Sequence, residues 1–304
     1  MTRPRVAVSS CLLGEPVRFN GGHSRDRFLA GLLDPYVDWV PICPEMEIGL
    51  GAPRETVRLE VGPRLMTRTT RVDLTDRMTT LARERAGGLV ADGYVFKARS
   101  PSCGIHGIPL YGPEGQPVDR RNRGMFSGAV MDAHPLLPVE DEGRLNDALL
   151  RESFVERVFA HARLRELLDG GSRPGDLVAF HTRHKMQLLA HDPELYRQAG
   201  RIVAGGPGVY AEVFQRALAR KASPGRNVNV LHHCLGMLDL DAVRTADLLA
   251  VIDSYKAGLV PLSVPTTLLR HHAHGQNAGY VRDQTFFSPY PDTLRLRNHT
   301  PADA

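Results

Sequence analysis

The sequence predicts an α/β domain with a mostly parallel, Rossmann-like sheet, followed by an all-α domain. Two patterns predict this order: short β-branched runs alternate with helical stretches up to about residue 135, and helical periodicity continues from residue 147 onward. The chain has 304 residues, of which 42% are hydrophobic, so it can bury two cores. This composition excludes a mainly disordered chain.

The first domain is expected to contain βαβ units. Its expected strands, each rich in β-branched or aromatic residues, cover residues 5–10, 37–43 and 93–100. Helical stretches such as residues 76–90 separate them. Strands that alternate with helices favour a parallel sheet, because each crossover returns the chain to the same edge.

A linker is expected at residues 132–146, where prolines precede an acidic run. The predicted domains therefore cover residues 1–138 and 147–304. The second domain is predicted to be helical at residues 149–168, 174–191, 207–221, 226–238 and 241–256. The apolar residues expected on one face of its first helix are Phe154, Val158, Leu164 and Leu168.

Composition also limits the expected localisation and the expected binding partners. No run of eighteen apolar residues and no apolar signal segment occurs, so we expect a cytoplasmic protein without membrane contact. The formal net charge of +4 only weakly favours anionic partners. Only four of the 38 basic residues are lysines, which suits phosphate binding but also results from a GC-rich genome. No obligate protein partner is inferred.

The four cysteines include no CxxC pair, so they fit neither a secreted disulfide scaffold nor a zinc ribbon. Cys11, Cys43 and Cys103 each follow an expected strand, and such strand ends meet at one edge of a parallel sheet. The three thiols can converge there, although a cysteine is also often a small buried apolar residue. Thiolates select zinc, copper(I) or an iron–sulfur cluster. Cys234 lies within an expected helix, where we expect it to be structural.

These residues carry a resemblance to a known family. The motifs are SSCLLG, the triplet CPE at residues 43–45, the turn at residues 73–75, and Lys97 followed by SPSCG at residues 100–104. Together they resemble the thiouracil desulfidase (TudS) family over about residues 3–135. The resemblance implies a 4Fe-4S cluster held by Cys11, Cys43 and Cys103. Its remaining iron would bind the sulfur of a thiolated pyrimidine.

The second half resembles a separate family of unknown function that is often fused behind the first, through segments such as LVAFHTRHKMQLLAHDPELYRQAGRIVA and QTFFSPYPDTLRLRNH. The fused arrangement is similar to the RudS proteins. This implies a hydrolase-type desulfidase that converts 4-thiouridine in tRNA to uridine and releases hydrosulfide without net electron transfer. Two alternatives stay open: a desulfidase of free thiouracil or thionucleosides, and a non-enzymatic, cluster-containing nucleic-acid-binding protein.

Within the motifs, several side chains are expected to act on the substrate. Glu45 stands two residues after a cysteine and is placed to deprotonate a water or to carry a proton to the ring. Ser100 and Ser102 offer hydroxyls to the substrate or the cluster, although Ser-Pro sequences also favour plain turns. Ser10 is a further substrate-binding candidate, and Lys97 is expected to orient a phosphate or Glu45. For His106, which lies near Cys103, we expect a solvent-exposed or supporting role rather than metal ligation.

The helical domain carries a basic segment. Residues 183–226 contain eight basic and three acidic residues. His181, His184 and Lys185 are spaced to share a helix face, which suits contacts with backbone phosphates. A merely solvated charged face is the alternative. The candidate RNA-binding residues are Arg183, Lys185, Arg220, Lys221 and Arg226. The adjacent pair His232 and His233 would point about 100° apart on a helix, so we expect no metal site there.

Overall fold

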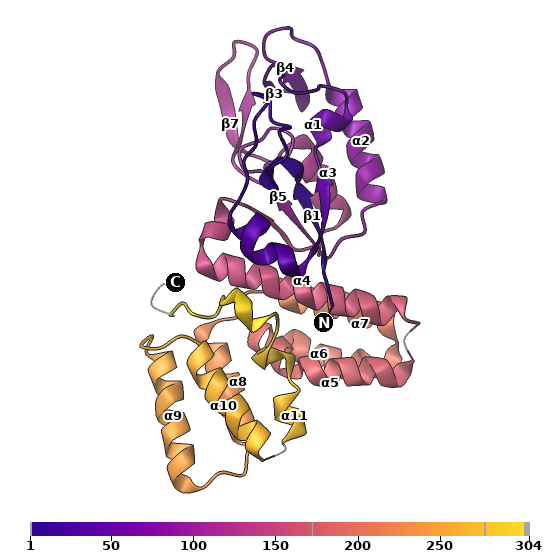
Figure 1. Ribbon diagram of the computed structural model, residues 1–304. Helices are drawn as coiled ribbons and strands as arrows, with labels where there is room; N and C mark the ends of the chain where they lie inside the picture. Colours follow the sequence, from indigo (N-terminus) through magenta and orange to yellow (C-terminus); the bar gives the residue numbers. More distant parts are fainter. Residues whose placement is uncertain (1, 172, 277, 301–304) are drawn as a thin grey trace. The chain divides into compact units, whose positions relative to one another are not determined.

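The computed structural model describes residues 2–171, 173–276 and 278–300. The chain divides into two units (Figure 1), of which the first comprises Arg3–Asn146 and the second begins at Asp147. The predicted fold class is confirmed, because the first unit contains a parallel sheet with helices and the second is helical. Among the described residues, no helix combines the length and the apolar character needed to cross a membrane.

A four-stranded parallel sheet in the order β2-β1-β5-β8 forms the centre of the first unit. Its strands are β1 (Arg5–Ser9), β2 (Asp38–Ile42), β5 (Gly93–Phe96) and β8 (Val139–Asp141). Ala7 of β1 lies opposite both Val40 of β2 and Tyr94 of β5. Nearly every residue of β1 and β5 is buried, which explains their uninterrupted apolar sequences.

Helices cover this sheet. They are α1 (Pro44–Glu47), α2 (Thr75–Gly87) and α3 (Met125–Ala133), and α2 and α3 lie side by side in Figure 1. Met78 of α2 and Phe126 of α3 share one hydrophobic core with Tyr94 of β5. Cys43 is the residue that caps the N-terminus of α1. A strand end and a helix start therefore position this cysteine from both sides.

A second, mixed sheet in the order β4-β3-β6-β7 was not predicted. Its strands are β3 (Val57–Glu60), β4 (Arg64–Thr67), β6 (Ile108–Tyr111) and β7 (Pro117–Asn122). β3 and β6 are parallel, whereas the two outer strands are antiparallel to their neighbours. The residues of β7 are mostly exposed and polar, so they lack the alternation that marks a half-buried strand.

The linker prediction for residues 132–146 is wrong. This segment contains the end of α3 and the edge strand β8, which pairs with β5 through Tyr94 and Val139. The first unit consequently extends to Asn146 instead of ending at residue 138. A three-residue strand among prolines and acidic residues is too short to show a periodic sequence pattern. It is a strand only because it pairs with β5, so the sequence alone could not identify it.

Eight helices of the second unit lie within the described residues: α4 (Ala148–Asp169), α5 (Pro174–His191), α6 (Pro193–Ile202), α7 (Pro207–Ala219), α8 (Pro224–Leu235), α9 (Ala242–Lys256), α10 (Ser263–Gly275) and α11 (Gly279–Arg282). The side chains of Asp192, Ser223 and Asp241 accept hydrogen bonds from the first backbone N–H groups of α6, α8 and α9. The predicted helices at residues 226–238 and 241–256 begin within two residues of α8 and α9, whereas α6 was not predicted.

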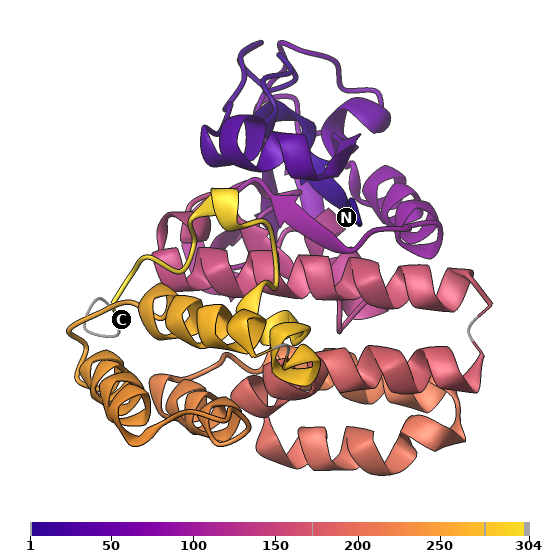
Figure 2. The same cartoon turned by 60° about the horizontal axis from the view of Figure 1, so that its bottom comes forward.

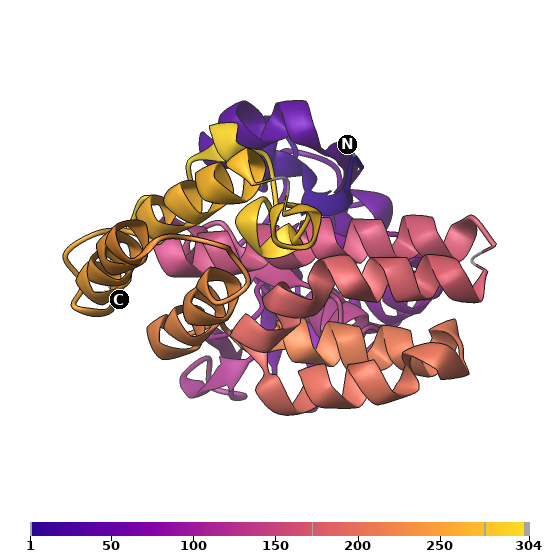
Figure 3. The same ribbon diagram turned by 90° about the horizontal axis from the view of Figure 1, so that it is seen from below.

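Within the described residues, two hydrophobic cores of the helical unit can be delimited. One joins α4, α5, α6 and α7 (Figure 2), and the other joins α5 with α8, α9 and α10, which are grouped together in Figure 3. α5 serves both cores, with Phe180 in the first and Met186 in the second. The expected apolar face of α4 is confirmed for Phe154, Val158 and Leu164, which are buried. It is wrong for Leu168, which is 38% exposed near the end of that helix.

Short 3-10 or π-helical turns complete the chain, at Ser10–Leu12, Phe28–Leu33, Asp34–Tyr36, Arg144–Asn146, Val203–Gly205, Thr285–Phe287 and Asp292–Leu294. The first of these turns follows β1 directly and carries Cys11. It is buried throughout, so the sheet and the turn together set the position of that thiol.

Candidate active site

Cys11, Cys43 and Cys103 line one cavity of about 430 Å³ in the first unit. Cys11 lies in the turn after β1, and Cys43 comes directly after β2. Cys103 is farther from its strand, because residues 97–102 form a connection between β5 and this cysteine. The predicted convergence at the carboxyl edge of the parallel sheet is therefore observed for all three residues.

Backbone contacts hold the Cys103 loop against the N-terminus of α3. The N–H groups of Phe126 and Ser127 donate to the carbonyl oxygen of Ser102, at 3.0 and 3.1 Å. A Cβ atom on Gly124 would lie 2.5 Å from the same carbonyl oxygen, so only glycine permits this approach. The first N–H groups of a helix have no partner inside it. The Ser102 carbonyl oxygen accepts hydrogen bonds from these N–H groups of α3, and the same hydrogen bonds hold the Cys103 loop in place.

Burial raises the pKa of all three thiols. The pKa of Cys11 rises to about 11, and that of the deeply buried Cys103 lies well above its ordinary value. Desolvation also raises the pKa of Cys43, which is half-buried. A thiolate at Cys43 would raise the pKa of the other two further, which reflects how near the three groups lie. A metal bound there would have to displace these protons.

Glu45 is the acidic residue among those that line this cavity, and hydrogen bonds hold both of its carboxylate oxygens. Its Oε1 accepts a hydrogen bond from Ser102 Oγ at 2.8 Å and a longer one from Ser100 Oγ at 3.5 Å. Its Oε2 accepts from Nε and Nη2 of Arg54, at 3.0 and 2.6 Å. The structure therefore joins the three predicted catalytic residues into one network and adds an arginine to it.

Arg54 is a site residue that sequence reasoning missed. Its side chain is 6% exposed, and its Nη1 donates to the carbonyl oxygens of Val17 and Gly51, at 2.9 and 2.6 Å. It thus ties Glu45 to two loops of the cavity wall. A single arginine after a proline carries no motif or periodicity, so only the fold could reveal this role.

Lys97 does not orient Glu45, contrary to that part of its prediction. It follows the end of β5, and its ammonium group forms an ion pair with Glu142 and donates to the carbonyl oxygen of Ala98. Its backbone N–H donates to Ser9 Oγ at 2.9 Å. Lys97 still lines the cysteine cavity, but the nearer carboxylate of Glu142 holds its charge.

Two further basic residues and one aromatic residue, which the sequence did not single out, also line the cavity. They are Arg18, Phe19 and Arg99. Phe19 is 41% exposed, and the Arg18 guanidinium lies 5.6 Å from the centre of its ring. Arg99 adopts a left-handed backbone conformation with φ 61°, which is uncommon outside glycine and often marks a functional loop.

The remaining single residues are placed as follows. Ser10 is buried and lines the cavity. His106 is largely exposed, with Nε2 3.1 Å from Oδ2 of Asp141, and does not line the cavity. Cys234 is fully buried in the second hydrophobic core of the helical unit, where apolar packing raises its pKa to about 12.

The thiols do not form a site for one metal ion. Within the described residues, no group of three or more His, Cys, Asp or Glu side chains is placed to hold a single ion. A cubane iron–sulfur cluster takes each thiolate on a different iron, so its protein ligands lie farther apart than those of one ion. Three cysteines around a shared cavity are therefore a donor set that fits a cluster better than zinc or copper(I).

In the helical unit, the predicted basic face of α5 is partly wrong. His181 and His184 are 3% and 2% exposed, so both belong to the core and not to a solvent face. His181 Nδ1 contacts the hydroxyl of Tyr210, and the His184 ring stacks on Phe180. Of the basic residues in this part of α5, Arg183 is therefore exposed and Lys185 partly exposed, whereas the two histidines are buried.

Two of the predicted RNA-binding arginines have structural partners. Arg220 Nε lies 3.0 Å from Oδ2 of the buried Asp192. Arg226 Nε donates to the carbonyl oxygen of Ala190 at 2.9 Å, and its Nη2 donates to that of Lys221. Both arginines connect the loop between α7 and α8 to the C-terminal end of α5. Lys221 itself is exposed, as is Arg183.

A basic groove lies between α5 and α6. It has a volume of about 440 Å³, includes no acidic lining residue, and contains the side chains of Lys185, Arg197 and Arg201. Of these, Lys185 belongs to the predicted RNA-binding set, whereas the two arginines of α6 were not selected from the sequence. Their spacing of four places them on one helix face, which was a usable sequence signal.

Comparison with known proteins addresses both units. The family model described as 2-thiouracil desulfurase matches residues 6–142, and that of a protein of unknown function (DUF1722) matches residues 185–291. The first unit therefore matches the 2-thiouracil desulfurase family over nearly its whole length. We call this part, Arg3–Asn146, the desulfurase unit. The predicted two-family arrangement is confirmed, including the second family of unknown function.

Two known proteins are similar to this chain. The uncharacterized protein YbgA of Escherichia coli (strain K12) is 30% identical over 158 residues, which cover 48% of this chain and 94% of that protein. A solved structure titled as a 4Fe-4S-dependent thiouracil desulfidase, TudS, is 27% identical, with a TM-score of 0.40. That match covers 50% of this chain and 99% of the TudS chain.

Proposed function

We propose that this chain removes sulfur from 4-thiouridine in tRNA, giving uridine and hydrosulfide. The observation that carries the proposal is the single cavity in which three thiols stand beside the Glu45–Ser102 pair. The reaction is hydrolytic and involves no net electron transfer. A water oxygen forms a bond to the ring carbon, the carbon–sulfur bond breaks, and sulfur leaves as hydrosulfide with one proton released.

The proposed cofactor is a 4Fe-4S cluster held by Cys11, Cys43 and Cys103. The match of the first unit to the desulfurase family and the thiolate donor set support this assignment. When bound through three cysteines, such a cluster supplies an iron with an open coordination position that acts as a Lewis acid. Cys234 takes no part, because it is buried in the other unit.

The side chains around Glu45 orient the attacking water. Arg54 holds one carboxylate oxygen by two N–H groups, so the carboxylate keeps one position and accepts a proton at Oε1. Ser102 and Ser100 donate to that same oxygen. Ser100 lines the cavity, so its hydroxyl can also contact a substrate, whereas Ser102 is fully buried outside the cavity lining and fixes the carboxylate. Ser10 stands on the cavity wall as a further contact to the pyrimidine.

A nucleotide within RNA, as opposed to a free base, fits the surroundings of the cavity. Phe19 offers an exposed ring on which a flipped base can stack, and Arg18 and Arg99 are placed to meet the phosphates beside it. In the helical unit, the groove of Lys185, Arg197 and Arg201 is suited to backbone phosphates. Arg183 and Lys221 are exposed cations that add to this surface.

The substrate can be identified with anaerobically reconstituted full-length protein. It is incubated separately with 4-thiouridine-containing tRNA, with the free nucleoside and with 2-thiouracil, and the near-ultraviolet absorbance of the thiocarbonyl and the released hydrosulfide are followed. We expect turnover of the tRNA. Turnover of the free compounds alone would overturn the RNA substrate, and no hydrosulfide from any of them would leave the binding-protein alternative.

Matched variants separate the two parts of the proposal. Cys11→Ala should lose iron and sulfide, whereas Cys234→Ala should keep both. Glu45→Gln should keep the cluster but lose turnover at least a hundredfold. Arg197→Gln together with Arg201→Gln should weaken tRNA binding and flatten its salt dependence, with unchanged iron content. Full turnover by the Glu45 variant would contradict the role given to that carboxylate.

A further inference from the structure

The basic groove between α5 and α6 has an aromatic and apolar wall in addition to its three cations. Lys185 lines it from α5, and Arg197 and Arg201 line it from α6, where they stand one turn apart. Tyr196 and Val203 line it too, and both pack against the hydrophobic core that joins α4, α5, α6 and α7. The core therefore supports a tyrosine ring in the wall of a groove that also carries three cations.

A glycine keeps this groove open. At 3.6 residues per turn, position 200 of α6 lies on the helix surface between positions 196 and 197, so Gly200 separates Tyr196 from Arg197. A Cβ atom on Gly200 would meet His181 Nε2 at 3.6 Å, which is an ordinary van der Waals distance. Packing therefore does not require glycine at this position. The missing side chain instead leaves space between the tyrosine ring and the guanidinium.

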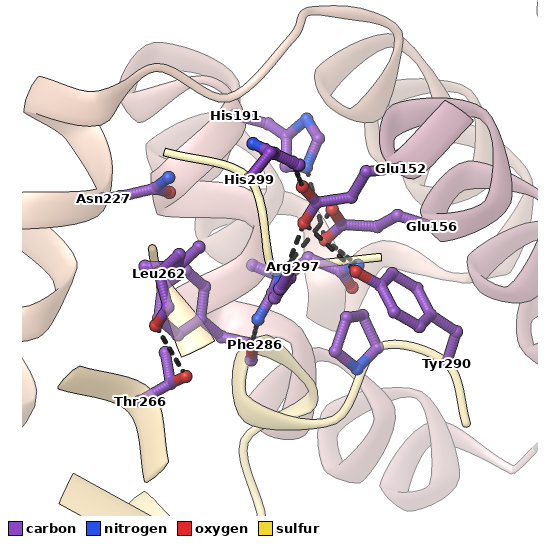
Figure 4. Close-up of polar contacts among 12 residues, drawn as sticks. Glu152, Glu156, His191, Asn227, Leu262, Thr266, Phe286, Tyr290, Arg297 and His299 are labelled. Atoms are coloured by element: carbon purple, nitrogen blue, oxygen red, sulfur yellow. Dashed lines mark hydrogen bonds and ion pairs between the residues drawn. The ribbon is translucent and has the colours of Figure 1, made fainter. Parts of the chain in front are cut away.

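A cluster of buried charges elsewhere in the helical unit is neutralised internally (Figure 4). Glu152 and Glu156 project from α4 toward Arg297 and His299. Arg297 Nε donates to Glu152 Oε1 at 2.9 Å, and His299 Nε2 lies 2.5 Å from Glu152 Oε2. His191 Nε2 faces Glu156 Oε1 at 3.4 Å. These groups line a cavity of about 250 Å³, but they pair with one another, so the cluster is complete without a ligand.

The three cations of the basic groove differ in this respect. Across the described parts of the chain, Lys185, Arg197 and Arg201 have no ion-pair partner and no side-chain hydrogen bond. No acidic residue lines the groove. His181, which also lines it, stays neutral at pH 7, because burial and then the Lys185 charge lower its pKa to about 4. The groove thus carries three positive charges that an anionic ligand would balance.

An aromatic ring among cations is the combination with which proteins bind single-stranded nucleic acid. Bases stack on the rings, and the cations follow the phosphates. In a duplex the bases are already stacked inside, so a duplex would reach the cations but leave Tyr196 unused. The groove volume of about 440 Å³ lies within the range of roughly 300–1,000 Å³ for small-ligand sites, which suits a unit as small as one nucleotide.

We propose that the basic groove binds an unpaired nucleotide of RNA, with its base against Tyr196 and the adjacent phosphates held by Lys185, Arg197 and Arg201. This inference rests on the RNA substrate of the proposed function, and it specifies that the helical unit holds a single-stranded part of that RNA. Inorganic phosphate would engage the cations but not the ring. The flat surface of an anionic membrane would meet the exposed arginines without entering the groove.

The groove can be tested with full-length protein and RNA that contains no thiouridine, so that binding is measured independently of turnover. Fluorescence anisotropy compares single-stranded octauridine with a blunt RNA duplex of eight base pairs. We expect the single strand to bind at least tenfold more tightly than the duplex, and inorganic phosphate to compete only at millimolar concentration. Equal or tighter binding of the duplex would overturn the proposal. Binding to phosphatidylglycerol vesicles without binding of octauridine would overturn it as well.

Variants separate the ring from the charge. Tyr196→Leu keeps an apolar side chain but removes the ring, so the Kd for octauridine should rise at least fivefold, whereas Tyr196→Phe should keep it. Gly200→Glu places a carboxylate in the groove and should raise the Kd at least tenfold. Gly87→Glu makes the same charge change at the exposed end of α2, outside the groove lining and where a Cβ atom meets nothing within 4 Å, and should leave the Kd unchanged.

Circular dichroism of each variant checks folding. If Gly200→Glu does not fold, Tyr196→Leu decides, and unchanged affinity in that variant would refute the stacked base. Hydrosulfide release from thiolated tRNA is measured separately. Loss of that reaction with intact octauridine binding would overturn the proposed reaction and leave the groove, whereas intact turnover without octauridine binding would overturn the groove alone.

Discussion

Mild acid should destabilise the helical unit, because two of its buried histidines resist protonation. Burial lowers the pKa of both His161 and His184 to about 3, and nearby arginines add to the effect. His184 Nδ1 lies 2.7 Å from the carbonyl oxygen of Phe180, so its proton is there and its Nε2 has no partner. A second proton on this ring would be a buried charge without an acceptor.

The size of the effect follows from linkage between protonation and unfolding. The folded pKa values lie below the unfolded value near 6.5, so the unfolded chain binds more protons below pH 6.5 and stability falls as the pH falls, down to about pH 3. At pH 5.5, one unit below the unfolded pKa, each histidine costs about 1.4 kcal/mol relative to pH 7.5. His161 and His184 together account for about 3 kcal/mol.

The desulfurase unit serves as an internal control for this measurement on the helical unit. Its single tryptophan, Trp39, lies in β2 of the desulfurase unit, whereas most helices belong to the helical unit. Urea unfolding of the full chain at pH 7.5 and 5.5, followed by far-ultraviolet circular dichroism and by Trp39 fluorescence, reports on the two units separately. The dichroism midpoint should move to lower urea by more than the fluorescence midpoint.

The His184→Asn variant isolates one histidine. The asparagine amide can replace Nδ1 as donor to the Phe180 carbonyl, but it does not titrate. Between pH 7.5 and 5.5, the unfolding free energy of this variant should fall by about 1.4 kcal/mol less than that of the wild type. Equal losses in the two proteins would refute the reasoning, since they would show that His184 is protonated as readily when folded.

Three other changes test the desulfurase unit. Arg54→Met leaves the shielded Glu45 carboxylate without its cation, so we expect the unfolding free energy in urea to drop by about 3–5 kcal/mol; a stability equal to the wild type would contradict this. Hydrogen bonds from two arginines lower the pKa of Glu60 to about 2. The stability difference between wild type and Glu60→Gln should be complete above pH 4.5 and disappear as the pH falls through about 2, and a pH-independent difference would argue against it. Gly124→Ala places a Cβ atom against the Cys103 loop, so iron content after reconstitution should fall at least twofold, whereas Gly31→Ala, which meets open space, should keep it; equal iron in both would exclude this packing role.

Local sequence patterns were sufficient for three strands of the parallel sheet, β1, β2 and β5, and for the helices α2, α4, α5, α7, α8 and α9. Buried β-branched runs mark β1 and β5, and capping residues such as Ser223 mark helix starts, because these signals lie within a few residues of the element itself. The mixed sheet lacked them, since β7 exposes most of its residues. Likewise, spacing alone placed His184 on a basic face, but the opposite faces of α5 both pack against neighbours and bury it.

The sequence by itself determined the two-part architecture, the three cysteines after parallel strands, and the placement of Glu45 and Ser102 within the motifs of a desulfurase family. Only the tertiary structure decided that Arg54 holds Glu45 and that Glu142 holds Lys97. It also decided that residues as distant as 152 and 299 line one cavity. The residue patterns of strands and helices are local properties, whereas strand order, ion pairs and cavity walls join residues that no short-range pattern relates.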